Sequence, residues 1–296
     1  MLVSFRAPIG WTEILKRTVH EVNEDNCLGL AAQLAFYFFL ALFPALLFLV
    51  ALVGYLPVEN LLSQLLAALG TVAPSEVLAL LRTQLNEVAQ GGHGGLLTLG
   101  IAGAIWSSSA ALVAIIDALN HAYDITEFRS WWKRRLVAIA LTLAMSLFIV
   151  TSLVLVLVGP DVAAWAAGWL GLGGAFTTIW SVIRWPVMIF LIVLGVDLVY
   201  HYAPNRRVAW VWITPGSLLA TALWILSSFG FKLYVANFGN FNATYGAIGG
   251  VAVLMLWFYV SGLAILIGAE VNGVIESARR HEASRTARPR PVERGT

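Results

Sequence analysis

A few ionisable side chains interrupt long apolar stretches of this sequence, and they are the groups that could carry chemistry. Arg184 and Asp197 lie in FTTIWSVIRWPVMIFLIVLGVDLVYHY, and Lys232 lies in WITPGSLLATALWILSSFGFKLYVANF. If such stretches cross a membrane, each charge costs about 2.5–3.5 kcal/mol to insert, so each is a candidate functional group. Cations held part-way into a membrane suit an anionic solute or the phosphate of a lipid headgroup. We therefore predict a polar pathway or substrate site at Arg184, Lys232 and Asp197.

Each of these three residues also has a structural explanation. Lys232 lies near the end of its stretch, where a long side chain can extend to the membrane surface. Arg184 could hydrogen-bond to a helix carbonyl or to an Asn. Asp197 could pair with one of three nearby groups, Arg206, Arg207 or His201.

A second set of polar residues follows the apolar stretches themselves. Asp117 and Asn120 follow SSSAALVAII, and Glu270 and Asn272 follow GLAILIGA. From Gly246 to Glu270 there are 24 residues, or about 36 Å of helix, slightly more than the roughly 30 Å hydrocarbon core of a bilayer. Glu270 is therefore predicted at the inner edge of the membrane.

Two roles remain open for this inner set. Glu270 could be a structural latch paired with Arg129 or Arg206, or it could form an inner gate with Asp117. At the other end of the same stretch, NFNATYG is polar and turn-like. We predict a candidate outer rim there, made of Asn240, Asn242 and Tyr245.

The elements that would position these groups are membrane helices. The chain has 296 residues, of which 59% are hydrophobic and only 11% charged, whereas soluble domains carry about 25% charged residues. A hydrocarbon core needs about 20 apolar residues per helix. Six stretches within a membrane domain over residues 1–277 meet this requirement: 31–56, 96–116, 136–159, 176–202, 212–238 and 247–269. We therefore predict an all-α membrane protein with six transmembrane helices.

The basic residues gather on one side of the predicted spans. The N-terminal segment, the second and fourth connections and the C-terminal segment hold 15 of the 18 lysines and arginines. Because such an excess marks the cytoplasmic side, both termini are predicted to be cytoplasmic. Residues 10–25 have an apolar stripe typical of an interfacial helix. Residues 57–94 are predicted to form a small helical cap outside the membrane, and residues 278–296 a basic, disordered cytoplasmic tail attracted to anionic lipid.

The sequence offers little for catalysis. The single Cys27 excludes an internal disulfide framework, and the five histidines form no HxxxH or HxH pair. There is no phosphate-binding Walker loop, no GxSxG motif and no metal-spaced Cys/His set. We predict no metal, no cofactor and no enzymatic activity.

Four long motifs stand out: LAAQLAFYFFLALFPALLFLVALVG, IWSSSAALVAIIDALNHAYDITEFRSWWKRR, YHYAPNRR, and the stretch from TPGSLLATALWILSSFG to LAILIGAEVN. They resemble the YihY/BrkB family, once labelled ribonuclease BN, over about residues 10–277. The resemblance implies a bacterial inner-membrane protein, with roles proposed in transport, in lipid or lipopolysaccharide export, and in serum resistance. A tRNA-processing metallonuclease would need closely spaced His and Asp ligands for two metals, and this sequence lacks such a cluster.

We therefore predict a transporter or lipid-handling protein of the inner membrane that acts on an anionic solute or a lipid headgroup. The alternative is a non-transporting scaffold that anchors envelope machinery through the 57–94 cap and the tail. Ribonuclease activity is the least favoured function. Membrane lipids are the expected partners and nucleic acid is not, and a homo-oligomer is left open.

Overall fold

The computed structural model describes residues 9–54, 94–157, 159, 169, 173–206, 211–238 and 241–287. Within these residues every regular element is a helix, as predicted. The seven helices are α1 (Trp11–Glu24), α2 (Cys27–Gly54), α5 (Gly94–Ala122), α6 (Trp131–Leu157), α8 (Gly173–Tyr202), α9 (Pro215–Phe238) and α10 (Phe241–Ala287). Residues 57–93 of the predicted cap lie outside the described residues.

The prediction of six membrane spans is confirmed, because α2, α5, α6, α8, α9 and α10 are each long and apolar enough to cross a membrane. In their apolar windows only 22–39% of the residues are buried inside the chain. Most of the apolar surface therefore faces outward, an arrangement that is costly in water and stable against lipid tails. The side of the membrane on which the termini lie stays a prediction.

Helix α10 extends beyond the predicted span at both ends. It begins at Phe241, so the segment that we predicted to be a turn is helical from that residue onward. It ends at Ala287, so residues 278–287 of the predicted disordered tail are helical too. The segment SARRHEASRTA consists mostly of good helix formers and reaches no proline before Pro289. An ion pair between Glu276 and Arg280, 2.6 Å long, supports the same helix.

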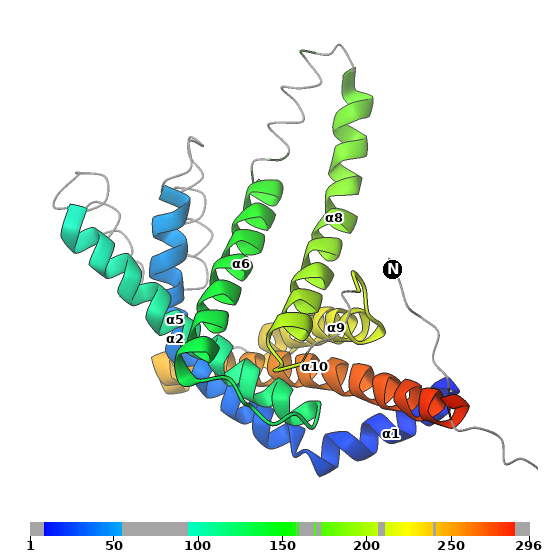
Figure 1. Cartoon of the computed structure of the whole chain (residues 1–296). Coiled ribbons are helices and arrows are strands. Elements are labelled where there is room, and N and C mark those ends of the chain that lie inside the picture. The colour runs from blue at the N-terminus through cyan, green and yellow to red at the C-terminus, as the bar shows by residue number, and fades with distance from the viewer. Residues whose placement is uncertain are drawn as a thin grey trace, which may run out of the picture.

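Helix α1 confirms the predicted amphipathic helix and shows how its apolar stripe divides. Ile14 is 2% exposed and packs against Val271, Val274 and Ile275 of α10, beside which α1 lies (Figure 1). Other apolar side chains of the stripe are exposed: Trp11, Leu15 and Val19. One part of the stripe therefore holds α1 on α10, and the other is free to enter the membrane interface.

The core forms where α2, α5 and α10 pack together. Its fully buried side chains come from all three helices: Ala31, Leu34, Ile116, Leu119, Leu266 and Ala269. Two of them, Ala31 and Ala269, are small, and small residues let helix backbones approach closely, which is the usual basis of packing between membrane helices. The connections predicted to be cytoplasmic lie at one end of this core, where the polar contacts described next are found.

Candidate functional site

Asp197 lies in a buried polar cluster where α8 ends and α9 begins. Its side chain is among the most buried of the chain and accepts hydrogen bonds from Thr214 Oγ1 at 2.6 Å and Ser217 Oγ at 2.7 Å. Thr214 directly precedes α9, and its Oγ1 accepts the backbone N–H of Ser217 at 3.2 Å. Pro215 follows at the first helical position, where a missing N–H costs nothing. A carboxylate of α8 therefore fixes the N-terminus of α9, where negative charge is favourable.

Asn272 joins α10 to the same cluster. Its Nδ2 donates to Thr214 Oγ1 at 3.0 Å, and its Oδ1 accepts the backbone N–H of Gly216 at 2.9 Å. A second bond comes from α8, where the Tyr200 hydroxyl donates to the carbonyl oxygen of Ile265 at 2.5 Å. Three helices are thus held together: Asp197 joins α8 to the start of α9, Asn272 joins α10 to the start of α9, and Tyr200 joins α8 to α10.

The structure gives Asp197 different partners from those we predicted. Pairing with Arg206 or His201 is wrong, because the described partners of the carboxylate are the hydroxyls of Thr214 and Ser217. Arg207, the third candidate, lies outside the described residues. Both residues lie at the start of the next helix, α9. Their distance from Asp197 along the sequence gave no reason to expect these hydrogen bonds.

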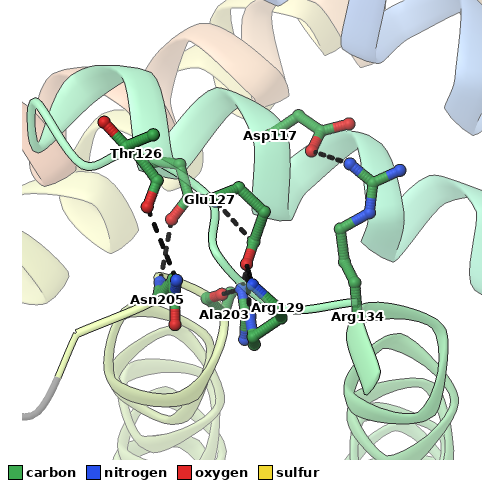
Figure 2. A network of polar contacts seen from close by, with 8 residues as sticks. Asp117, Thr126, Glu127, Arg129, Arg134, Ala203 and Asn205 are labelled. Atoms are coloured by element: carbon green, nitrogen blue, oxygen red, sulfur yellow. Dashed lines mark hydrogen bonds and ion pairs between the residues drawn. The ribbon is translucent and has the colours of Figure 1, made fainter. Parts of the chain in front are cut away.

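The α5–α6 and α8–α9 connections are joined by a second network (Figure 2). Glu127 accepts hydrogen bonds from Asn120 Nδ2 at 2.9 Å and from Arg129 Nε and Nη2 at 2.8 and 2.6 Å. Arg129 Nη2 also donates to the carbonyl oxygen of Ala203 at 2.7 Å, and the Asn205 N–H donates to Asn120 Oδ1 at 2.8 Å. Burial alone would raise the pKa of Glu127, but the bonds from Arg129 and Asn120 outweigh burial and hold that pKa below its usual range.

Arg206 connects the second network to α10. Its Nη1 pairs with Glu276, its guanidinium lies over the Tyr123 ring at 3.8 Å, and Glu276 also pairs with Arg280. Burial raises the pKa of Tyr123 above its usual range, although the Arg206 charge acts in the opposite direction. The arginines of the two basic connections therefore pair with carboxylates other than Glu270: Arg129 with Glu127, and Arg206 with Glu276.

Glu270 is 2% exposed and contacts the α1–α2 turn. Its Oε1 accepts a hydrogen bond from the Cys27 thiol at 3.3 Å, and the Asp25 carboxyl lies close enough for the two charges to interact. Burial raises the pKa of Asp25, and the nearby Asp124 carboxylate adds to that rise. The turn itself is made by Asn26, whose φ of 50° is a left-handed conformation that Asn tolerates better than most residues.

The predicted partners of Glu270 are therefore wrong, since Arg129 pairs with Glu127 and Arg206 pairs with Glu276. The alternative, an inner gate formed with Asp117, stays a prediction. Asp117 pairs with Arg134 at 2.7 Å (Figure 2), and its side chain is 48% exposed, unlike that of Glu270. The placement of both acids at the inner membrane boundary stays a prediction. Many basic residues lie near them in the sequence, and spacing does not select among these possible partners.

Arg184 and Lys232 are not brought together among the described contacts. Helices α8 and α9 run in different directions from their junction (Figure 1), and Lys232 is exposed. The Arg184 guanidinium lies 5.6 Å from the Trp185 ring. Its Nε and the Trp180 indole nitrogen are buried and have no hydrogen-bond partner among the described residues. We call Trp180 and Arg184 the α8 donor pair, because a spacing of four residues puts them on one helix face.

The predicted outer rim is not tested. Asn240 lies outside the described residues. Asn242 and Tyr245 lie within α10, but their side chains are outside the described part of the chain.

An open pocket of about 550 Å³ lies beside the second network. Its lining combines two arginines, four other polar or aromatic side chains and one proline: Arg129, Arg206, Phe128, His201, Tyr202, Asn205 and Pro204. Phe128 is 83% exposed and Tyr202 is 54% exposed, so aromatic surface borders the opening.

Comparison with known proteins decides the family. The family model described as virulence factor BrkB matches residues 18–293, which contain both polar networks, the α8 donor pair and the pocket. The chain belongs to the BrkB family.

Relatives of this BrkB-family chain come from several bacteria. YfkH of Bacillus subtilis is 37% identical over 263 residues, which are 89% of this chain and 93% of YfkH. A UPF0761 membrane protein of Photobacterium profundum is 27% identical over 297 residues, covering 93% of this chain and 87% of the relative. Another, from Ralstonia nicotianae, is 26% identical over 278 residues, but this chain covers only 60% of it. No solved structure matches. Together with the six apolar helices, these relatives show a multi-pass bacterial membrane protein.

YfkH is named as ribonuclease-like. In the part of this BrkB-family chain that the structure describes, no group of three or more His, Cys, Asp or Glu residues could hold a metal ion. That the chain lacks enzymatic activity stays a prediction.

Several residues of these clusters were missed by sequence reasoning. Thr214 and Ser217 form a pattern typical of the N-terminus of a helix. That pattern predicts a helix cap, but it does not predict the hydrogen bonds of both side chains to Asp197. Glu276 lies four residues after the end of the last family motif, at Asn272. Nothing in the sequence pairs Cys27 with Glu270. For Trp180 a signal existed, since it lies four residues before Arg184.

Proposed function

We propose that this BrkB-family protein moves or positions an anionic solute or an anionic lipid headgroup in the membrane. The observation that carries the proposal is the α8 donor pair. The Trp180 indole N–H and the Arg184 Nε–H are buried without an acceptor in the described part of the chain. A buried donor without a partner costs about 1–3 kcal/mol, and more when it is charged. An anion that supplies the acceptor would recover that cost.

The geometry of the pair favours an anion with more than one oxygen. Trp180 faces the end of α6, since a Cβ on Gly159 would lie 3.0 Å from the indole nitrogen. Arg184 is one helical turn further along the same face. A carboxylate or a phosphate can accept from both donors, and guanidinium binds such groups better than an ammonium does. Under the predicted orientation this site lies in the outer half of the membrane.

Transport measurements in proteoliposomes test the proposal. The purified protein is reconstituted, and two rates are followed: uptake of glycerol phosphate, and exchange of fluorescent phosphatidylglycerol between leaflets. We expect Arg184→Ala to lower the supported rate at least tenfold. Trp180→Phe removes only the N–H and should lower it several-fold. Lys133→Ala is the control, because it removes an exposed charge from α6, a helix that neighbours α8, and it should stay within twofold of the natural protein. Unchanged rates in both α8 variants would refute the proposal.

A second candidate, a non-transporting scaffold, is favoured by the length of α10. This helix continues to Ala287, about 27 Å beyond the predicted end of the span at residue 269. It could hold a partner of the envelope machinery away from the membrane. The scaffold predicts that Arg184→Ala has no effect in cells, whereas deletion of residues 279–296 or 57–94 abolishes function.

A further inference from the structure

The pocket beside the second network lies at the opposite end of α8 from the donor pair, and its chemistry is that of an anion site. Arg129 and Arg206 both line it, and the side chain of each is 15% exposed. The described hydrogen bonds of Arg129 use Nε and Nη2, and that of Arg206 uses Nη1. Arg129 Nη1 and Arg206 Nη2 therefore have no acceptor among the described residues.

These two guanidinium groups are held in place before any ligand arrives. Arg129 is fixed by Glu127 and the Ala203 carbonyl, and Arg206 is fixed by Glu276 and the Tyr123 ring. Fixed side chains lose little conformational entropy when they bind, which favours affinity.

The surroundings of the pocket match the level of lipid headgroups. Exposed aromatic side chains lie at this end of the helices: Phe128, Trp131, Trp132, Tyr202 and Trp212. Tryptophan and tyrosine gather at the membrane–water interface, where the ring is in apolar surroundings and the polar atom is hydrated. A volume of about 550 Å³ falls within the roughly 300–1,000 Å³ usual for ligand sites.

We infer that this pocket binds a phosphate group, presented by an anionic phospholipid, between Arg129 and Arg206 with Phe128 and Tyr202 along the acyl chains. Basic pockets between membrane helices are a recurrent way of holding anionic lipid headgroups, and a planar guanidinium suits a phosphate better than a point charge does. The inference concerns binding alone, so it does not depend on the transport activity proposed above.

Binding of lipid to the purified protein tests the inference. Titrations with short-chain phosphatidylglycerol, phosphatidylcholine and inorganic phosphate are followed by native mass spectrometry in detergent. Arg206→Gln and Arg280→Gln form a matched pair, because both arginines pair with Glu276 and only Arg206 lines the pocket. We expect Arg206→Gln to weaken phosphatidylglycerol binding at least tenfold and Arg280→Gln to weaken it less than twofold.

Further measurements distinguish binding of a lipid phosphate from binding of free phosphate, and they test whether the variants fold. Competition by millimolar inorganic phosphate would show that the phosphate alone suffices, and its absence would show that the lipid is required. Phe128→Ala changes an exposed residue and should weaken lipid binding several-fold while leaving inorganic phosphate binding unchanged. Arg206→Lys tests folding with the charge retained, and we expect partial recovery of affinity. Equal binding of phosphatidylcholine and phosphatidylglycerol, or equal loss in Arg206→Gln and Arg280→Gln, would overturn the inference.

Discussion

Gly216 and Gly268 bring the backbones of α9 and α10 into direct contact. A Cβ atom built on Gly216 would overlap the carbonyl oxygen of Gly268, and one built on Gly268 would overlap the carbonyl oxygen of Gly216. The close approach lets Asn272 reach the Gly216 N–H and the Thr214 hydroxyl. The two glycines thus determine whether the Asp197 cluster can form.

Replacing either glycine should therefore destabilise the protein. We expect Gly216→Ala and Gly268→Ala to cost at least about 1–3 kcal/mol, because a crowded contact forces the backbones apart. The measurement is thermal unfolding of the detergent-solubilised protein. Gly230→Ala is the control within α9, since a Cβ there meets nothing within 4 Å. It should be neutral or stabilising, as is usual for Gly→Ala in a helix. A loss in Gly230→Ala equal to that in Gly216→Ala would contradict the explanation.

The Asn272 amide should contribute to stability through its two bonds. Asn272→Ala leaves the Gly216 N–H without its acceptor in a partly buried site, and we expect a loss of about 1–3 kcal/mol. Asn23→Ala serves for comparison, because Asn23 makes one exposed bond, to the Val19 carbonyl. Chemical denaturation in mixed micelles gives both free energies of unfolding. If the two variants lose the same stability, the cluster does not hold the helices together.

The Glu127 network should make stability depend on pH at the acidic end. Since the folded pKa of Glu127 is lowered, its contribution is complete above the unfolded pKa of about 4.3. It is lost as the pH falls through the folded pKa. Glu127→Gln should therefore be less stable than the natural protein at pH 7, and the difference should shrink toward pH 3. Unfolding curves across this range measure it, and a difference that does not change with pH would exclude ionic stabilisation by Glu127.

Asp25 should show the opposite dependence. Burial, together with the Asp124 charge, raises its folded pKa, so its stabilising contribution is present below the unfolded pKa of about 3.9 and is lost as the pH rises through the folded pKa. Asp25→Asn should accordingly unfold at higher temperature than the natural protein at pH 7, and the two should converge at low pH. The same unfolding series measures this. A lower unfolding temperature for Asp25→Asn at pH 7 would show that the carboxylate is stabilised by contacts that outweigh its burial.

The predicted orientation can be tested by reporter fusions. We expect a fluorescent reporter that folds in the cytoplasm to be active when fused after Thr296, and a phosphatase that requires the outer compartment to be inactive there. The reason is the excess of lysine and arginine in the connections that meet at one end of the bundle. An active phosphatase at this position would reverse the topology and place the pocket between Arg129 and Arg206 outside the cytoplasm.

The sequence by itself determined the class of fold and the number of spans. Long apolar stretches must be helical in a membrane because their backbone groups can bond only within the segment, so length and hydropathy were sufficient. It also located Asp117 and Glu270 at the ends of apolar stretches. It did not determine where α10 ends, because helix propensity between residues 278 and 287 outweighs the basic composition that suggested disorder.

Only the tertiary structure decided which polar groups meet. Glu270 contacts Cys27, 243 positions away, Asp197 meets Thr214 and Ser217 at a helix start, and Arg206 pairs with Glu276. Charge permits many pairings along one membrane boundary, and the crossing of the helices selects among them. The contact of Gly216 with Gly268 is one such crossing. It depends on two segments that share no local pattern, and its consequence for Asp197 and Asn272 follows from packing alone.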